Sequence, residues 1–178
     1  MTDPRYPIGK FEKPAPLDEA ARRRAIDAIA AAPARARAAV AGLSDAQLDT
    51  PYRAGGWTAR QVVHHLPDSH MNSYVRFRLA LTEDEPTIRT YHEERWAELP
   101  DAKSAPVALS LDILDALHAR WVRMLRAMTP ADFARTLQHP ESGRWTLDGL
   151  LALYAWHGDH HIAQITSLRD RESWGKAS

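Results

Sequence analysis

Apolar side chains recur at steps of three and four residues along four long segments of the chain, which is the spacing of one face of an α-helix. These segments span residues 18–41, 58–81, 106–128 and 146–168. The connections between them do not show the regular alternation of polar and apolar residues that is typical of a half-buried strand. The pattern therefore predicts an all-α fold, a four-helix bundle.

Local signals mark where three of these helices begin and where two of them are disturbed. Asp18, Thr58 and Thr146 each stand at a predicted helix start, where their side chains can accept a hydrogen bond from a free backbone N–H. Pro33 and Pro67 lie inside the first two helices. Each proline removes one intrahelical hydrogen bond and crowds the carbonyl four residues earlier, so we expect a local kink in both helices.

The segments outside the helices differ in character. Residues 1–17 contain four prolines and predict an extended arm, whereas residues 18–178 have the length of a single helical-bundle domain. Residues 82–105 are polar and unusually long for a connection, which is typical of a functional segment or a partner surface. Residues 133–143 are expected to form a loop or short turn.

Composition narrows the possible functions. The 23 basic and 23 acidic residues cancel, so there is no basic excess to favour nucleic acid or an anionic membrane. No apolar run approaches the length of a membrane span or of a signal-peptide core, so we expect a cytoplasmic protein. Cysteine is absent, which excludes disulfides, thiolate zinc sites and a cysteine nucleophile. Any bound metal must use histidine or carboxylate ligands.

Histidine is the residue type with a distinctive distribution. Six of the nine histidines fall in two clusters on predicted helices: His64, His65 and His70, then His157, His160 and His161. His157 and His161 are four residues apart and share the apolar face of the last helix, whereas His160 lies toward its flank. Two buried imidazoles without partners would cost about 1 to 3 kcal/mol each, and a divalent cation would relieve that cost.

A catalytic metal site commonly has three protein ligands and an open position, so a third donor must come from another helix. His64 and His65 point about 100° apart and are not expected to reach the same ion. We favour His65, because its face of the helix is polar enough to line a cleft, and keep His64 as the alternative. The residues thus predict one divalent metal per subunit, held by His65, His157 and His161.

Several other residues have two open interpretations. Asp68, one turn after His65, is a candidate general base or hydrogen-bond acceptor for that imidazole, and equally an ordinary surface residue. Gln164 is a candidate to orient His161 or to bind substrate, and the alternative is an ordinary glutamine on the helix surface. Arg76 and Tyr154 are candidates to bind an acidic substrate, and the alternative is a structural role. A non-enzymatic alternative is a structural or regulatory metal in a dimer, which would require a fourth protein ligand such as His70 or Asp68.

Two motifs carry a resemblance to a known family. The segment from Trp57 to Tyr74, WTARQVVHHLPDSHMNSY, and the segment from His157 to Ile165, HGDHHIAQI, resemble the YfiT branch of the DinB family of four-helix metalloproteins. The likeness extends over nearly the whole chain. Pro67 departs from the family pattern, where a small helix-compatible residue is usual.

The resemblance implies a metal site and an activity. It implies zinc or nickel bound by one histidine of the second helix and a His-x3-His of the last, which are His65, His157 and His161 in this chain. It also implies a homodimer and a metal-dependent hydrolase with a small-molecule substrate. Some relatives instead act as S-transferases that join a low-molecular-weight thiol, such as bacillithiol, to an electrophile, and the resemblance leaves both reactions open.

Overall fold

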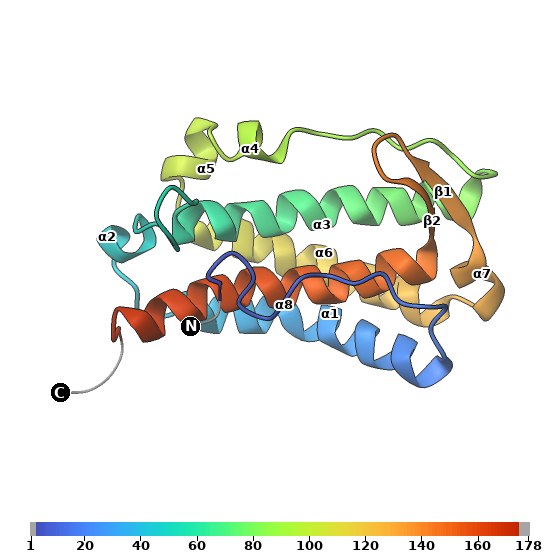
Figure 1. Cartoon of the computed structure of the whole chain (residues 1–178), viewed down its shortest axis with the longest axis horizontal. Helices are drawn as coiled ribbons and strands as arrows, with labels where there is room; N and C mark the ends of the chain where they lie inside the picture. Colours follow the sequence, from blue (N-terminus) through green and yellow to red (C-terminus); the bar gives the residue numbers. More distant parts are fainter. Residues whose placement is uncertain (1–2, 175–178) are drawn as a thin grey trace.

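A computed structural model describes residues 3–174 and shows a bundle of four long helices (Figure 1). The long helices are α1 (Glu19–Val40), α3 (Ala59–Thr82), α6 (Val107–Ala127) and α8 (Leu147–Arg171). The predicted all-α four-helix bundle is confirmed. Within residues 3–174, no helix combines the length and the apolar character needed to cross a bilayer.

The order of the helices around the bundle differs from their order in the chain. Each of α1 and α3 packs against both α6 and α8, so α1 and α3 occupy opposite corners. In Figure 1, α1 and α8 run in one direction and α3 and α6 in the other. Because α3 and α8 are antiparallel neighbours, the first half of α3 lies beside the second half of α8.

Shorter elements complete the connections: α2 (Asp45–Leu48), α4 (Glu93–Trp96), α5 (Pro100–Ser104), α7 (Pro130–Ala134), β1 (Thr136–His139) and β2 (Gly143–Thr146). The two strands form an antiparallel hairpin where we expected a loop, so that prediction was wrong. Each strand has only four residues, too few for an alternating pattern to stand out. Leu137 of β1 is fully buried and anchors the hairpin on the helices.

The local signals at the helix starts act as expected. Thr58 and Gln61 form a reciprocal capping box at the start of α3, and the hydroxyl of Thr146 accepts from the backbone N–H of Gly149 at the start of α8. Both α1 and α3 continue on either side of their internal prolines, Pro33 and Pro67. The structure therefore preserves each helix while removing one hydrogen bond from its ladder.

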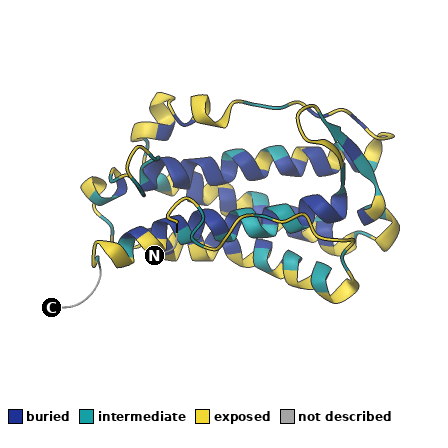
Figure 2. Cartoon of the chain, viewed as in Figure 1, coloured by how far each residue is buried: buried dark blue, intermediate teal, exposed yellow. Residues whose placement is uncertain are grey.

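Buried residues are concentrated along the long helices of the bundle (Figure 2). The apolar ones form two clusters along the bundle. On α3 the first cluster ends at Leu66 and the second begins at Tyr74, and on α8 the boundary falls between Tyr154 and Ile162. Buried polar residues occupy the layer between the clusters on these helices: Ser69, His70, Ser73, His160 and His161. This polar layer, which also includes His118 of α6, crosses the middle of the molecule.

A buried ion pair fixes the start of α1 against the start of α8. The guanidinium of Arg22 donates two hydrogen bonds, of 2.7 and 2.8 Å, to the carboxylate of Asp148, which also accepts from the backbone N–H of Leu17. Residues 3–17 lie along α8 as an arm without helix or strand, and its first part forms two turns, closed by hydrogen bonds from Tyr6 to Asp3 and from Gly9 to Tyr6 (Figure 1). Asp148 therefore positions both the first helix and the arm.

We expect Asp148→Ala to lower the free energy of unfolding by about 3 kcal/mol, because it leaves the Arg22 charge half-buried without its partner. Asp27→Ala is the matched control, since Asp27 pairs with Arg126 on the surface and should contribute less than about 1 kcal/mol. Urea unfolding followed by circular dichroism measures both values. Equal effects of the two substitutions would contradict the assigned role of Asp148.

Candidate metal centre

Three histidines converge between α3 and α8. His65 comes from α3, and His157 and His161 come from successive turns of α8. Each offers one ring nitrogen, and these three atoms lie within 4.8 Å of one another. The Nε2 atoms of His65 and His157 are 3.3 Å apart. We call these residues the three-histidine cluster.

The protein environment keeps the three rings neutral. Burial lowers the pKa of His65 to about 4 and holds the pKa values of His157 and His161 well below the ordinary value for histidine. A neutral imidazole keeps one nitrogen lone pair, which is the form that ligates a metal. The cluster therefore presents lone pairs rather than positive charges at neutral pH.

A row of hydrogen-bonded histidines extends from the cluster across the bundle. Nδ1 of His157 is 3.1 Å from Nε2 of His70, and Nδ1 of His70 is 2.8 Å from Nε2 of His118. Nδ1 of His118 is 2.6 Å from the backbone carbonyl of Ile29. We call His157, His70, His118 and this carbonyl the histidine row.

The row has a fixed direction of donation. A carbonyl oxygen can only accept, so Nδ1 of His118 carries its proton and Nε2 of His118 accepts from His70. By the same step His70 accepts from Nδ1 of His157. Burial holds the pKa values of His70 and His118 below the ordinary value, so both rings are neutral. The consequence is that Nε2 of His157, which faces His65, is left with its lone pair.

Pro33 explains why the Ile29 carbonyl is available. In a regular helix that carbonyl would accept from the backbone N–H four residues later, and residue 33 has no N–H. The mid-helix proline that the sequence predicted as a disturbance of α1 thus frees the last acceptor of the histidine row.

Gln164 orients the third ring. Its Oε1 lies 2.9 Å from Nδ1 of His161, and its Nε2 lies 3.0 Å from Nε2 of His160. The amide accepts from His161 and donates to His160, so Nε2 of His161 also keeps its lone pair. His160, which we expected on the flank of the helix, is buried and stacks on Trp156 beneath Tyr6 of the arm.

Two cavities open beside the three-histidine cluster and share Trp57, Glu93 and His161. One, of about 360 Å³, is lined by all three histidines together with Arg76, Tyr91 and Tyr154. The other, of about 660 Å³, lies between the arm, the loop before α3 and α4, and is lined by Arg5, Arg53, Glu98 and Gln164 among others. The cluster is therefore buried but reachable by a small molecule.

The donor set fits a divalent metal with an open coordination side. Three imidazoles facing a cavity match the arrangement of catalytic zinc sites, whereas closed structural sites have four protein ligands. Within residues 3–174, no carboxylate or fourth histidine joins the group. His70, the candidate fourth ligand, uses both ring nitrogens in the histidine row.

The structure places the two remaining candidates away from the cluster. His64, the alternative to His65, contacts the hydroxyl of Ser110 and the carbonyl of Ala105 with its two ring nitrogens. Asp68 does not line either cavity. Burial, with a smaller contribution from the charge of Asp101, raises the pKa of Asp68 to about 6. A catalytic role for Asp68 stays a prediction.

Sequence reasoning missed the roles of His70 and His118. Their pairing depends on the order of helices around the bundle, which the chain order does not reveal. One signal was present: His118 lies on the apolar stripe of its helix, where a histidine requires a buried partner, and Pro33 offers a free carbonyl on another helix.

Comparisons with known proteins agree with this architecture. The family model of the DinB superfamily matches residues 28–165. A protein of Bacillus mycoides, provisionally named a metal-dependent hydrolase, is 55% identical over 98% of this chain and 100% of its own length.

Two solved structures that resemble this chain are also four-helix bundles. YfiT from Bacillus subtilis, described as "a probable metal-dependent hydrolase with an unusual four-helix bundle topology", is 47% identical, with a TM-score of 0.95 over 98% of this chain and 100% of its own. A second four-helix bundle protein, TT2238, shares the fold with a TM-score of 0.54 at 23% identity, over 79% of this chain and 94% of its own.

The histidine row predicts that His118 affects the metal site indirectly, through His70 and His157. We expect His118→Phe to lower metal affinity about tenfold or more, because His70 loses its acceptor and no longer fixes the His157 ring. Competition with a chromophoric chelator measures the affinity. Long-range ¹H–¹⁵N NMR of the metal-free protein should show His70, His118, His157 and His161 protonated at Nδ1.

His64→Phe is the matched control. It also removes a buried histidine with two hydrogen bonds, so we expect a comparable loss of stability, of about 2 kcal/mol, in both variants. Metal affinity should change only in His118→Phe. If the two variants bind metal equally well, or if NMR finds His157 protonated at Nε2, the deduced direction of the row is wrong.

The raised pKa of Asp68 gives a separate prediction on stability. A carboxyl group whose pKa is higher in the folded than in the unfolded state destabilises the fold increasingly as pH rises from about 4 to about 6. We therefore expect Asp68→Asn to match the wild type near pH 4 and to be more stable above pH 6, by roughly 1 kcal/mol. Thermal unfolding between pH 4 and 8 measures the difference, and a variant less stable at pH 7 would contradict it.

Proposed function

This chain belongs to the DinB superfamily, and we propose that it is a metal-dependent hydrolase that holds one divalent ion, zinc or nickel, through His65, His157 and His161. The observation that carries the proposal is the convergence of three neutral imidazoles on one side of a 360 Å³ cavity. Histidine nitrogens suit both metals, and the ligands alone do not select between them.

The metal and the cavity have separate tasks. When bound, the ion supplies Lewis acidity, which lowers the pKa of a water molecule and polarises a carbonyl oxygen. The walls of the cavity would orient the substrate. Its volume suits a small molecule rather than a folded protein.

Two hydroxyl groups are placed to assist. Burial raises the pKa of Tyr91 to about 12, so this phenol stays protonated and can donate a hydrogen bond to an oxygen of the substrate where negative charge develops. The hydroxyl of Ser69 lies 3.4 Å from Nε2 of His157 and lines the same cavity. Neither group is required to ionise.

The proton released from water needs an acceptor on the cavity wall. Glu93 borders both cavities beside His161, whereas Asp68 borders neither. We therefore assign the acceptor role to Glu93 rather than to Asp68. This assignment uses position alone, because a general base must first lie within reach of the proton that it removes.

The proposal predicts that metal content and hydrolysis fail together. Purified His157→Ala and His161→Ala proteins should lose stoichiometric metal and at least 99% of ester hydrolysis, because two imidazoles hold the ion far more weakly than three. His160→Ala is the control and should retain its metal, since His160 contacts Gln164 and lies outside the three-histidine cluster. Elemental analysis and a panel of activated esters measure both properties.

A second arm of the assay separates hydrolysis from thiol transfer. The metal-loaded protein is incubated with monobromobimane in the presence and absence of a low-molecular-weight thiol. Turnover of esters without thiol supports the hydrolase. Turnover confined to the thiol arm would replace hydrolysis by S-transfer at the same site, and metal retention by His161→Ala would refute the site itself.

A further inference from the structure

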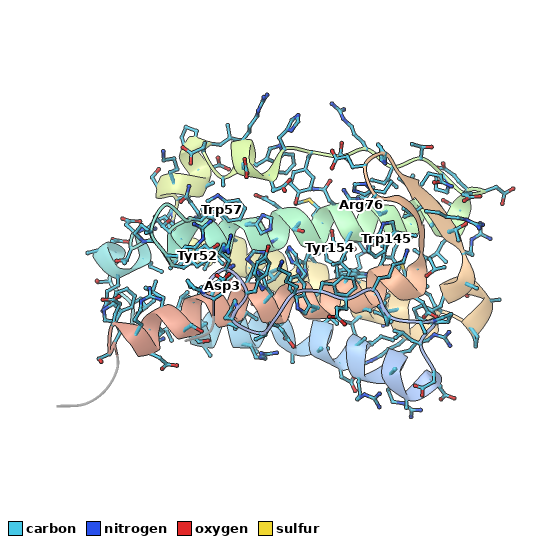
Figure 3. All side chains as sticks on the ribbon, in the orientation of Figure 1. Asp3, Tyr52, Trp57, Arg76, Trp145 and Tyr154 are labelled. Carbon is cyan, nitrogen blue, oxygen red and sulfur yellow. The ribbon has the colours of Figure 1, made fainter. Side chains whose placement is uncertain are left out.

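Arg76 is a buried cation in the wall of the 360 Å³ cavity, which we call the reactive cavity. It belongs to α3, is 9% exposed, and lines the same 360 Å³ cavity as the three-histidine cluster. Figure 3 shows it near Tyr154, whose hydroxyl is 3.5 Å from one of its terminal nitrogens. The side chain is therefore held next to the space that a substrate would occupy.

The guanidinium is poorly satisfied by the protein. Its other terminal nitrogen is 3.4 Å from the carbonyl of Arg89, and its buried Nε has no hydrogen-bond partner. Within residues 3–174, no carboxylate lies at ion-pair distance from it. A buried charge without a counter-charge is costly and usually indicates a functional site.

Two other arginines, Arg60, which is buried, and Arg22, which is partly buried, each have carboxylate partners. The guanidinium nitrogens of Arg60 lie 2.8 and 2.6 Å from carboxylate oxygens of Asp45 and Asp49. Arg22 donates hydrogen bonds to Asp148 from two nitrogens. Both serve to fasten helices or connections together. Arg76 makes no comparable bond, so its position is not explained by a structural task.

The groups that face Arg76 do not neutralise it. Glu93 and Glu141 line the same cavity, but both are exposed, whereas the Arg76 guanidinium is buried. His139 of the hairpin also borders the cavity, and its Nδ1 accepts hydrogen bonds from the backbone N–H groups of Glu141 and Ser142. Arg76 therefore has no counter-charge in contact among residues 3–174, and an anionic ligand would supply one.

We propose that Arg76 binds a carboxylate of the substrate, so that the reactive carbonyl lies at the three-histidine cluster and the acid at the other end of the cavity. This inference rests on the proposed function of the cluster. A guanidinium offers a planar fork of donors that matches a carboxylate. Arg76 follows His65 by eleven residues, about 16 Å along the helix axis, and its side chain tilts back toward the cluster. The substrate class is thus an ester or amide with a carboxylate several bonds from the scissile bond.

The first test is binding, which does not require catalysis. The full-length protein, as purified and after addition of zinc, is titrated with hexanoate and with the neutral hexanamide. We expect hexanoate to bind at least tenfold more tightly, and to shift the ¹H–¹⁵N signal of Arg76 Nε. Arg76→Met should lose this preference, and Arg76→Lys should keep part of it. Arg78→Met, an exposed arginine on the same helix, is the control and should bind like the wild type.

The second test is stability, which separates a binding role from a structural one. If Arg76 is an unpaired charge kept for a ligand, Arg76→Met replaces it by an apolar side chain of similar length and should raise the melting temperature. Hexanoate should then stabilise the wild type but not the variant. A lower melting temperature with unchanged hexanoate binding would show a structural role and overturn the proposal.

The third test joins the inference to the reaction. We compare the 4-nitrophenyl half-ester of adipic acid with 4-nitrophenyl hexanoate, which lacks the acid. Arg76→Met should lower kcat/KM at least tenfold for the half-ester and less than threefold for the neutral ester. Equal losses for both esters would refute the assigned specificity. Arg76-dependent binding of hexanoate without hydrolysis of either ester would keep the acid site and reject hydrolysis at the cluster.

Discussion

The need to satisfy buried imidazole nitrogens governs the centre of this bundle. Four histidines of the polar layer, His70, His118, His160 and His161, lie where the core of a four-helix protein is normally apolar, and the partly buried His157 contacts His70 and His161. A buried polar atom without a partner costs about 1 to 3 kcal/mol, which favours organised hydrogen bonds in this layer, although Nδ1 of His160 and the hydroxyl of Ser73 have no partner. The carbonyl that Pro33 releases from α1 provides a fixed acceptor, and every later donor in the histidine row follows from it. A backbone feature of one helix thus decides which nitrogen is free on the opposite side of the bundle.

Different parts of the long helices stabilise the fold and form the candidate site. Apolar clusters above and below it supply most of the packing, so the middle of the molecule can keep groups that do not stabilise the fold. The arm closes one side of the layer through Tyr6 and Arg5, and the segment after α3 closes another through Tyr91. Between these coverings, two cavities reach the three-histidine cluster. Burial therefore keeps the rings neutral without sealing them from a small molecule.

Sequence periodicity predicted the four helices because amphipathic stripes of more than twenty residues are strong local signals. Spacing also predicted that His157 and His161 share a face, and the polarity around His65 favoured it over His64. The hairpin was not predicted, because strands of four residues are too short to show an alternating pattern. His118 and His160 escaped for a different reason: their partners, Ile29 and Gln164 with the covering arm, depend on tertiary packing that one-helix geometry cannot give.

Polar groups without a protein partner lie at both ends of the reactive cavity. At one end, hydrogen bonds on the far side of His157 and His161 leave lone pairs that can ligate a cation. At the other end, Arg76 retains a positive charge that requires an anion. Filling only one of these needs would leave the other group buried and unsatisfied. The proposed substrate, a small molecule with a polarisable carbonyl and a carboxylate, would satisfy both when bound against the proposed divalent ion. The histidine lone pairs and the Arg76 guanidinium are thus the observations from which we infer the charge of the proposed ion and of the proposed substrate.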